Sequence, residues 1–95
     1  MTRESYVYIL TNKTHRLLYT GVTNDLARRI QEHREGKANS FTKRYKVTKS
    51  VHVESFGDIR DAIAREKQIK AGSRQWKVDL INEGNPEWRD LSEYP

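Results

Sequence analysis

The stretch over residues 19–33, which reads YTGVTNDLARRIQEH, places the strongest constraint on how this chain folds. The apolar residues 17–22 predict a short strand, the Thr-Asn-Asp of residues 23–25 a capped turn, and residues 26–35 a helix. Gly21 lies near the end of the strand, where a glycine usually marks a bulge or a close backbone approach. A rigid strand and a rigid helix are thus joined by a very short turn.

The predicted helix brings two polar side chains beside its apolar face. Leu26 and Ile30 are four residues apart and share that face, and Arg29 and His33 have the same spacing. On a helical wheel His33 lies about 20° from Leu26 and Arg29 about 60°. An arginine and a histidine are therefore expected at the boundary between helix and sheet. In such positions an arginine is more often a surface residue with a packed stem, and a histidine more often a satisfied core residue.

Two further strands are expected around this unit. Residues 6–12, YVYILTN, are rich in β-branched and aromatic types and predict a strand, which a polar turn joins to residues 17–22 as an antiparallel hairpin. Neither face of this strand is polar, so we expect it to be covered on both sides. Residues 50–56 alternate and predict a third strand.

Two helices are predicted after the third strand. Asp58 is expected to cap a helix over residues 59–71, which Gly72 ends, and Ser73 to cap another over residues 74–82. The order β-β-α-β-α-α predicts an α+β fold, a small three-stranded antiparallel sheet flanked by helices. We expect one domain over residues 1–95 with its core in about 5–91.

The composition suggests a polyanionic partner, and an ordinary soluble surface with excess lysine is the alternative. Eighteen Lys and Arg against 13 Asp and Glu give a net charge of +5. Residues 37–49 contain five of these cations and no acid, interleaved with Phe41 and Tyr45, and are expected to be an exposed basic loop that binds nucleic acid through Lys43, Arg44 and Lys46. The absence of cysteine excludes disulfides and thiolate chemistry, and with no membrane span or signal peptide we expect a cytoplasmic protein.

Glu66 interrupts the apolar stripe expected on the helix over residues 59–71. The wheel places it among the residues that define the expected buried arc, which are Ile59, Ala62, Ile63 and Ile69. A carboxylate there costs desolvation energy unless a partner compensates it. A salt bridge to Lys70, four residues on, is the favoured interpretation, and a carboxylate aimed at a cation or metal is the alternative.

Together these residues resemble the GIY-YIG nuclease domain. The resemblance rests on YVY at 6–8, YTG at 19–21, an arginine ten residues after the second tyrosine, a histidine four further on, and Glu66. It covers about residues 5–91, and the whole chain, including NPEWRDL at 85–91, looks like the small stand-alone bacterial members. The spacing, rather than the tripeptides, makes the match specific.

The resemblance implies an endonuclease that cleaves DNA, or alternatively RNA, in DNA repair or processing. Tyr8 would be a general base or position the water, Tyr19 would lie near the scissile phosphate, and Arg29 would clamp that phosphate. His33 matches a histidine of some members, and Glu66 would be the one protein ligand of a single Mg²⁺ or Mn²⁺. The family's downstream asparagine corresponds to Asn82 or Asn85, with Asn85 preferred.

The sequence also departs from the family pattern. Tyr6 and Val7 replace the Gly and Ile of the first tripeptide, Thr20 replaces an Ile, and Val22 stands where some members have a lysine. If that lysine helps to deprotonate a tyrosine, another group, such as His33, must do so here. Two alternatives therefore stay open: a non-catalytic nucleic-acid-binding module, and a protein-interaction domain with an exposed Trp88 patch. For targeting we expect weak sequence specificity, a structure-specific substrate, or a partner protein that directs the chain.

Overall fold

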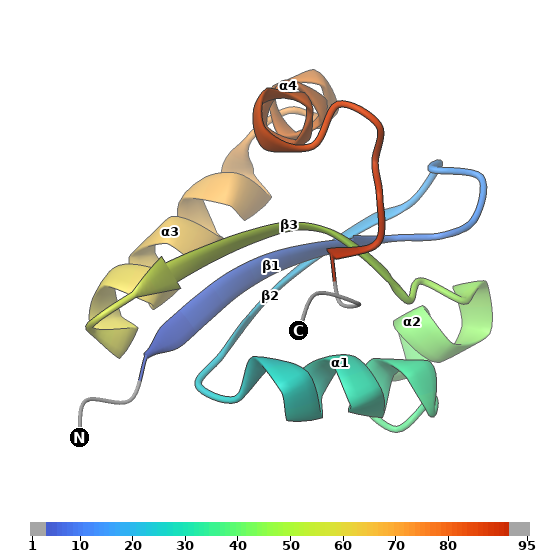
Figure 1. The fold of residues 1–95 in the computed structure, drawn as a ribbon, viewed down its shortest axis with the longest axis horizontal. Helices are drawn as coiled ribbons and strands as arrows, with labels where there is room; N and C mark the ends of the chain where they lie inside the picture. Colours follow the sequence, from blue (N-terminus) through green and yellow to red (C-terminus); the bar gives the residue numbers. More distant parts are fainter. Residues whose placement is uncertain (1–3, 92–95) are drawn as a thin grey trace.

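The sheet is built on the hairpin that β1 (Ser5–Thr11) forms with β2 (Leu18–Thr23). β3 (Lys49–Phe56) pairs antiparallel with the other edge of β1, so the strand order is β2-β1-β3 (Figure 1). The structure is a computed structural model that describes residues 4–91. The three antiparallel strands confirm the predicted α+β fold.

β1 is the central strand and is buried on both faces. Val7 and Ile9 point to one face and Tyr8 and Leu10 to the other, and all four side chains are fully buried. This burial on both sides explains why β1 shows no polar alternation, and it confirms the expectation from its sequence.

In the described part of the chain, four helices cover the two faces of the sheet. α1 (Leu26–Arg34) and α2 (Ser40–Tyr45) lie on one face, and α3 (Ile59–Ala71) and α4 (Arg74–Gly84) on the other (Figure 1). Asp25, Asp58 and Ser73 cap α1, α3 and α4, and the predicted elements end within two residues of the observed ones. Within residues 4–91, no helix has the length and apolar character needed to cross a bilayer.

The prediction of a loop over residues 37–49 is wrong, because α2 forms within it. The Asn39 side chain accepts a hydrogen bond from the Thr42 backbone N–H and caps the helix, while Lys46 ends it in the left-handed conformation with φ 53°. Thr42 and Val47 are fully buried, so this short helix is anchored to the core. Its cations and aromatic residues are consequently held on a rigid element.

The buried face of α3 is rotated relative to the predicted one. Ala62 and Ile69 are fully buried, but Ile59 and Ile63 are 43% and 37% exposed, so the expectation that these two are buried is wrong. The face of α3 that contacts the sheet instead includes Arg65. Its guanidinium forms a bidentate ion pair with Glu54 of β3. Glu66 therefore lies at the margin of the buried stripe rather than in its middle.

Trp88 belongs to the core, so the proposal of an exposed Trp88 interaction patch is wrong. Its side chain is 9% exposed and packs with the cluster that includes Val51 and Ile81. The indole N–H donates to the Asn82 side-chain oxygen at 2.7 Å, and the ring stacks on His15 with centroids 4.9 Å apart. The polar edge of the ring is thus satisfied while its apolar area is buried.

Candidate active site

The Tyr8 hydroxyl is the centre of a polar cluster on the face of the sheet covered by α1. It lies 3.0 Å from His33 Nε2 and 3.3 Å from Arg29 Nε. The β1–β2 register places Tyr8 directly opposite Gly21, and a Cβ at position 21 would collide with the hydroxyl and the ring carbon that bears it. Gly21 therefore makes the space through which the phenol reaches the two α1 side chains, which confirms the close approach expected from sequence.

The hydrogen bonds around His33 define its tautomer. Thr42 donates its hydroxyl hydrogen to the Asn39 backbone carbonyl at 3.2 Å, so its oxygen accepts from the His33 Nδ1–H at 3.1 Å. Nε2 then carries a lone pair and accepts the Tyr8 hydroxyl hydrogen, while Arg29 Nε donates to the Tyr8 oxygen. The cluster is thus a directed chain in which Tyr8 already points its proton at an acceptor.

Burial keeps both members of this chain neutral. Burial lowers the pKa of His33, and the positive charge of Arg29 lowers it further. Burial also raises the pKa of Tyr8, against the opposing hydrogen bond and charge of Arg29. Near neutral pH His33 is consequently a free base, and Tyr8 is a neutral phenol rather than a standing phenolate.

Arg29 lies between this buried pair and solvent. The hydrogen bond to Tyr8 raises its pKa, so the guanidinium stays charged. Nη1 is 3.4 Å from a Glu32 carboxylate oxygen, and among residues 4–91 Nη2 has no hydrogen bond. A polar cleft of about 380 Å³ borders Arg29 and Arg28. An arginine that lines a polar cleft and keeps a nitrogen without a hydrogen bond can receive a phosphate oxygen.

Tyr19 extends the cluster toward the surface. Its ring meets the His33 ring edge-on, with centroids 5.3 Å apart, and stacks against Phe41 at 6.4 Å. The Tyr19 hydroxyl accepts a hydrogen bond from the Asn39 side-chain amide at 3.1 Å. A continuous series of rings therefore leads from the buried Tyr8 to the exposed side chains of α2.

Glu66 approaches the cluster from the opposite face of the sheet. Its carboxylate is 3.5 Å from Lys70 Nζ, so the salt bridge favoured from sequence is present, and the Glu66 side chain is 16% exposed. Its negative charge is also among the causes that raise the pKa of Tyr8, which places it within electrostatic reach of the hydroxyl. The salt bridge favoured from sequence is thus confirmed, and the metal-ligand alternative stays a prediction.

The donor set around Glu66 fits a weakly ligated hard cation. Among the described residues no three His, Cys, Asp or Glu side chains come together as a metal-binding group, so a multi-ligand site is absent from that part of the chain. A single carboxylate is sufficient for Mg²⁺ or Mn²⁺ when waters and substrate phosphate oxygens provide the other ligands. Glu66, the one predicted protein ligand, would provide that single carboxylate.

The face of α2 carries the predicted nucleic-acid contacts. Lys43, Arg44 and Lys46 are exposed, as are Phe41 and Tyr45, and the Arg44 guanidinium lies 5.5 Å from the centre of the Tyr45 ring. Cations neutralise phosphates, while exposed aromatic rings offer stacking surfaces for bases. Because Phe41 stacks on Tyr19, this surface is continuous with the Tyr8 cluster.

The preferred asparagine does not join the cluster. Asn85 is buried, and its side chain donates to the backbone carbonyls of Val51 and Arg89 and accepts from the Arg89 backbone N–H, at 2.9–3.1 Å. Asn82 instead accepts from the Trp88 indole. The structure therefore brings together Tyr8, Tyr19, Arg29 and His33, with Glu66 nearby, and gives Asn85 contacts of a structural kind.

Sequence reasoning missed the two residues that orient this cluster. Asn39 holds the Tyr19 hydroxyl, and Thr42 fixes the His33 tautomer. The signal available for Asn39 was its capping pattern, an asparagine three residues before a threonine at the start of a possible helix. The contact between Thr42 and His33 joins residues nine apart on two helices, and no local pattern predicts it.

Comparison with known proteins places these residues in a family context. Residues 4–79 match the model of the GIY-YIG catalytic domain. A UPF0213 protein of Syntrophus aciditrophicus is 42% identical over 87 residues, covering 88% of this chain and 95% of the relative, and one of Haloquadratum walsbyi is 38% identical over 79 residues, covering 83% and 88%.

A solved structure has the same fold. The solution NMR structure of a UPF0213 protein from Bacillus halodurans superposes with a TM-score of 0.60 at 31% identity, covering 92% of each chain. The names of these three relatives state no substrate. The reaction and its substrate must therefore be argued from the site itself.

Proposed function

The chain belongs to the GIY-YIG nuclease family, and on this premise we propose that it is a divalent-metal-dependent endonuclease that hydrolyses phosphodiester bonds in DNA. One observation carries the proposal: the Tyr8 hydroxyl is held between an acceptor, His33 Nε2, and a cationic donor, Arg29 Nε. A phenol in that position can pass its own proton to His33 Nε2 as its oxygen takes one from a water that enters the site with the bound phosphate.

In the proposed reaction His33 is the base and Tyr8 transmits the proton. A water attacks the phosphorus and gives a proton to the Tyr8 oxygen, while the Tyr8 proton moves to His33 Nε2. The P–O bond to the leaving strand breaks, and the leaving oxygen takes a proton from solvent. This route needs no standing phenolate, which agrees with the raised pKa of Tyr8 and the lowered pKa of His33.

Arg29 and Tyr19 act on the phosphate in this proposal. Arg29 lines the polar cleft, and its guanidinium would stabilise the charge that grows on the phosphate oxygens in the transition state. The Tyr19 ring contacts the rings of His33 and Phe41, and it would therefore connect the site to the exposed α2 surface. Val22 stands where some family members have a lysine, and in this proposal His33 serves as the base in place of that lysine.

Glu66 would hold the metal ion. One Mg²⁺ or Mn²⁺ bound there would supply positive charge to the phosphate oxygens and leaving group. Lys70 is four residues from Glu66 and 54% exposed, so it can leave the carboxylate without loss of packing. The contacts among Tyr8, Tyr19, Arg29 and His33 do not involve this salt bridge.

The α2 surface would bind the strand that enters the site. Its cations give sequence-independent affinity, which suits a protein with a net charge of +5. We propose that the polymer is DNA, and RNA is the other polymer to be tested. The protein would act in DNA repair or processing, together with a partner protein that supplies targeting.

The test is a cleavage assay on plasmid, branched DNA and RNA of matched sequence, with Mg²⁺, Mn²⁺ or EDTA. We expect nicking with either metal, none with EDTA, and none by Glu66→Ala or Arg29→Ala. Undiminished cleavage by purified Glu66→Ala would contradict the metal assignment. If the wild type binds DNA with an affinity that falls as salt rises but never cleaves it, the non-catalytic binding module is the better description.

A further inference from the structure

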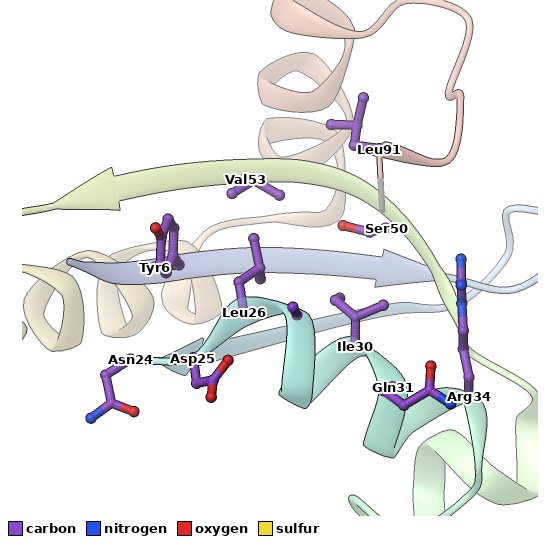
Figure 2. Close-up of a pocket in the computed structure, with 11 residues that line it drawn as sticks. Tyr6, Asn24, Asp25, Leu26, Ile30, Gln31, Arg34, Ser50, Val53 and Leu91 are labelled. Atoms are coloured by element: carbon purple, nitrogen blue, oxygen red, sulfur yellow. The ribbon is translucent and has the colours of Figure 1, made fainter. Parts of the chain in front are cut away.

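A second cavity lies on the flank of α1 that faces away from Arg29. It has a volume of about 770 Å³ and opens between α1 and the strands β1 and β3 (Figure 2). Its apolar walls come from Leu26 and Ile30 of α1 and from Val53 of β3, with the Tyr6 ring at one end. A volume of this size is typical of pockets for small organic groups rather than of packing defects.

A buried hydroxyl in this cavity lacks a partner. Ser50 is 1% exposed, and its Oγ is the one buried side-chain polar atom within residues 4–91 that has no hydrogen bond. Figure 2 shows the Ser50 side chain facing the same space as Val53 and Leu26. Leaving a buried hydroxyl unpaired costs free energy, so a ligand with a polar edge would be stabilised there.

The charges at the rim favour a neutral ligand. Arg34 lies at the rim and forms an ion pair with Asp90 at 3.2 Å, so its charge is balanced, and Asp25 adds a carboxylate. Gln31 contributes an amide that can both donate and accept. An anionic phosphate has no net attraction to this rim, whereas a planar heterocycle with apolar faces and a polar edge matches its chemistry.

The position of the cavity connects it to the cleft at Arg29. Asn24 and Asp25, at the start of α1, line both. A strand whose phosphate lies at Arg29 can therefore pass over the start of α1 and place a neighbouring nucleotide at the cavity.

We propose that this cavity binds one unpaired nucleobase of the strand being cleaved, with the base packed against Tyr6 and its polar edge at Ser50. This inference rests on the proposed function. A base held in the cavity would position the strand so that the scissile phosphate lies at Arg29. Occupancy by a base satisfies the Ser50 hydroxyl and buries the apolar walls.

The test is binding of a fluorescent oligonucleotide in EDTA, with single abasic nucleotides moved along the strand. We expect one abasic position to weaken binding about tenfold, as removal of a stacked base does. Ala27→Trp fills the mouth of the cavity from an exposed position. It should weaken binding of the intact strand by the same factor, and removal of the critical base should then cause no further loss. The matched control Ala64→Trp, on an exposed position of α3, should behave as wild type.

Two outcomes would overturn the inference: no abasic position matters, or the abasic loss persists unchanged in Ala27→Trp. Ser50→Ala is the second variant. Because Ser50 Oγ makes no hydrogen bond, its loss should not destabilise the fold, and it should weaken binding of the intact strand but not of the critical abasic one. As a readout independent of the strand, deoxynucleoside monophosphates should shift the backbone NMR signals of Gln31 and Val53, and shifts confined to residues outside the cavity would contradict base binding.

These measurements are separable from the proposed function. Binding in EDTA does not need cleavage, so a base-binding cavity in a protein that never nicks DNA would refute the endonuclease and leave the cavity assignment standing. Metal-dependent cleavage, with no loss of binding at any abasic position, would support the endonuclease and refute base binding in the cavity.

Discussion

Tyr8 and Gly21 lie opposite one another in adjacent strands, and the Tyr8 phenol occupies the volume that a side chain at position 21 would need. The hydroxyl reaches His33 and Arg29 only because β2 has no side chain at that point. The glycine is therefore a requirement of the site, and the two residues should be regarded as one unit.

Substitution of Gly21 by alanine should damage both stability and activity. The new methyl group overlaps a fully buried, rigid ring, so we expect a loss of about 1–3 kcal/mol in the free energy of unfolding and a strong drop in cleavage rate. Urea unfolding followed by circular dichroism measures the first. Gly57→Ala is the control, because nothing lies within 4 Å of a Cβ there, and equal losses in the two variants would contradict the packing described.

The stability of the protein should fall on mild acidification because of His33. Its pKa is lower in the folded protein than the ordinary 6.5, since burial and Arg29 disfavour the charged ring. Between the folded and unfolded pKa values the unfolded chain binds more protons, so stability is present above about pH 6.5 and declines as the pH falls below it.

The His33→Gln variant isolates this contribution. Titration of one proton accounts for a slope of at most about 1.4 kcal/mol per pH unit, and the variant should lack that part of the slope between pH 7.5 and 5. His15, whose pKa burial and Lys49 also lower, remains in both proteins and cancels in the comparison. Parallel stability curves for wild type and variant would refute a buried neutral His33.

The fold was largely predictable because its signals are local. Caps such as Asp58 and Ser73, the continuous apolar run of β1 and the 3.6-residue periodicity of α1 each act within a few residues. The tyrosines, Arg29 and His33 could be placed near one face for the same reason, and the structure brings them within hydrogen-bonding or ring contact.

What could not be predicted depends on how the elements dock. Ile59 and Ile63 looked buried, but the Arg65–Glu54 ion pair and the small Ala62 turn α3 away from them. The exposed Trp88 patch belonged only to the protein-interaction alternative, and the partners that bury this ring, His15 and Val51, come from distant parts of the chain. Tertiary contacts of this kind override local pattern, and Thr42 beside His33 is the same case inside the site.

The cations of α2 should each contribute to the salt dependence of DNA binding. Replacing Lys43, Arg44 or Lys46 singly with Gln should reduce the slope of log K against log salt by about 0.7–0.9, the amount expected for one phosphate contact. Fluorescence anisotropy over a range of salt concentrations measures this slope. Lys13→Gln, in the β1–β2 turn, serves as the control and should leave it unchanged, whereas three unchanged slopes would remove α2 from the binding surface.

Asn85 should prove to be a stability residue. Its buried amide makes three hydrogen bonds to backbone groups of Val51 and Arg89, so Asn85→Ala should cost about 3 kcal/mol of unfolding free energy. The cleavage rate of the protein that remains folded should stay near that of the wild type. Asn82→Ala, which loses only the Trp88 indole bond, should cost about 1 kcal/mol. A normal stability with lost cleavage would instead give Asn85 a catalytic role.

Glu66→Gln separates the metal ligand from the salt bridge. The charge that a bound ion adds to the phosphate is worth several kcal/mol, so cleavage should fall at least about a hundredfold. The pair with Lys70 is partly solvated, and its loss should change stability by less than about 1 kcal/mol. Lys70→Gln breaks the same pair and keeps the carboxylate, so it should retain metal-dependent cleavage. If both variants lose cleavage equally, the function of Glu66 is to hold Lys70 rather than a metal ion.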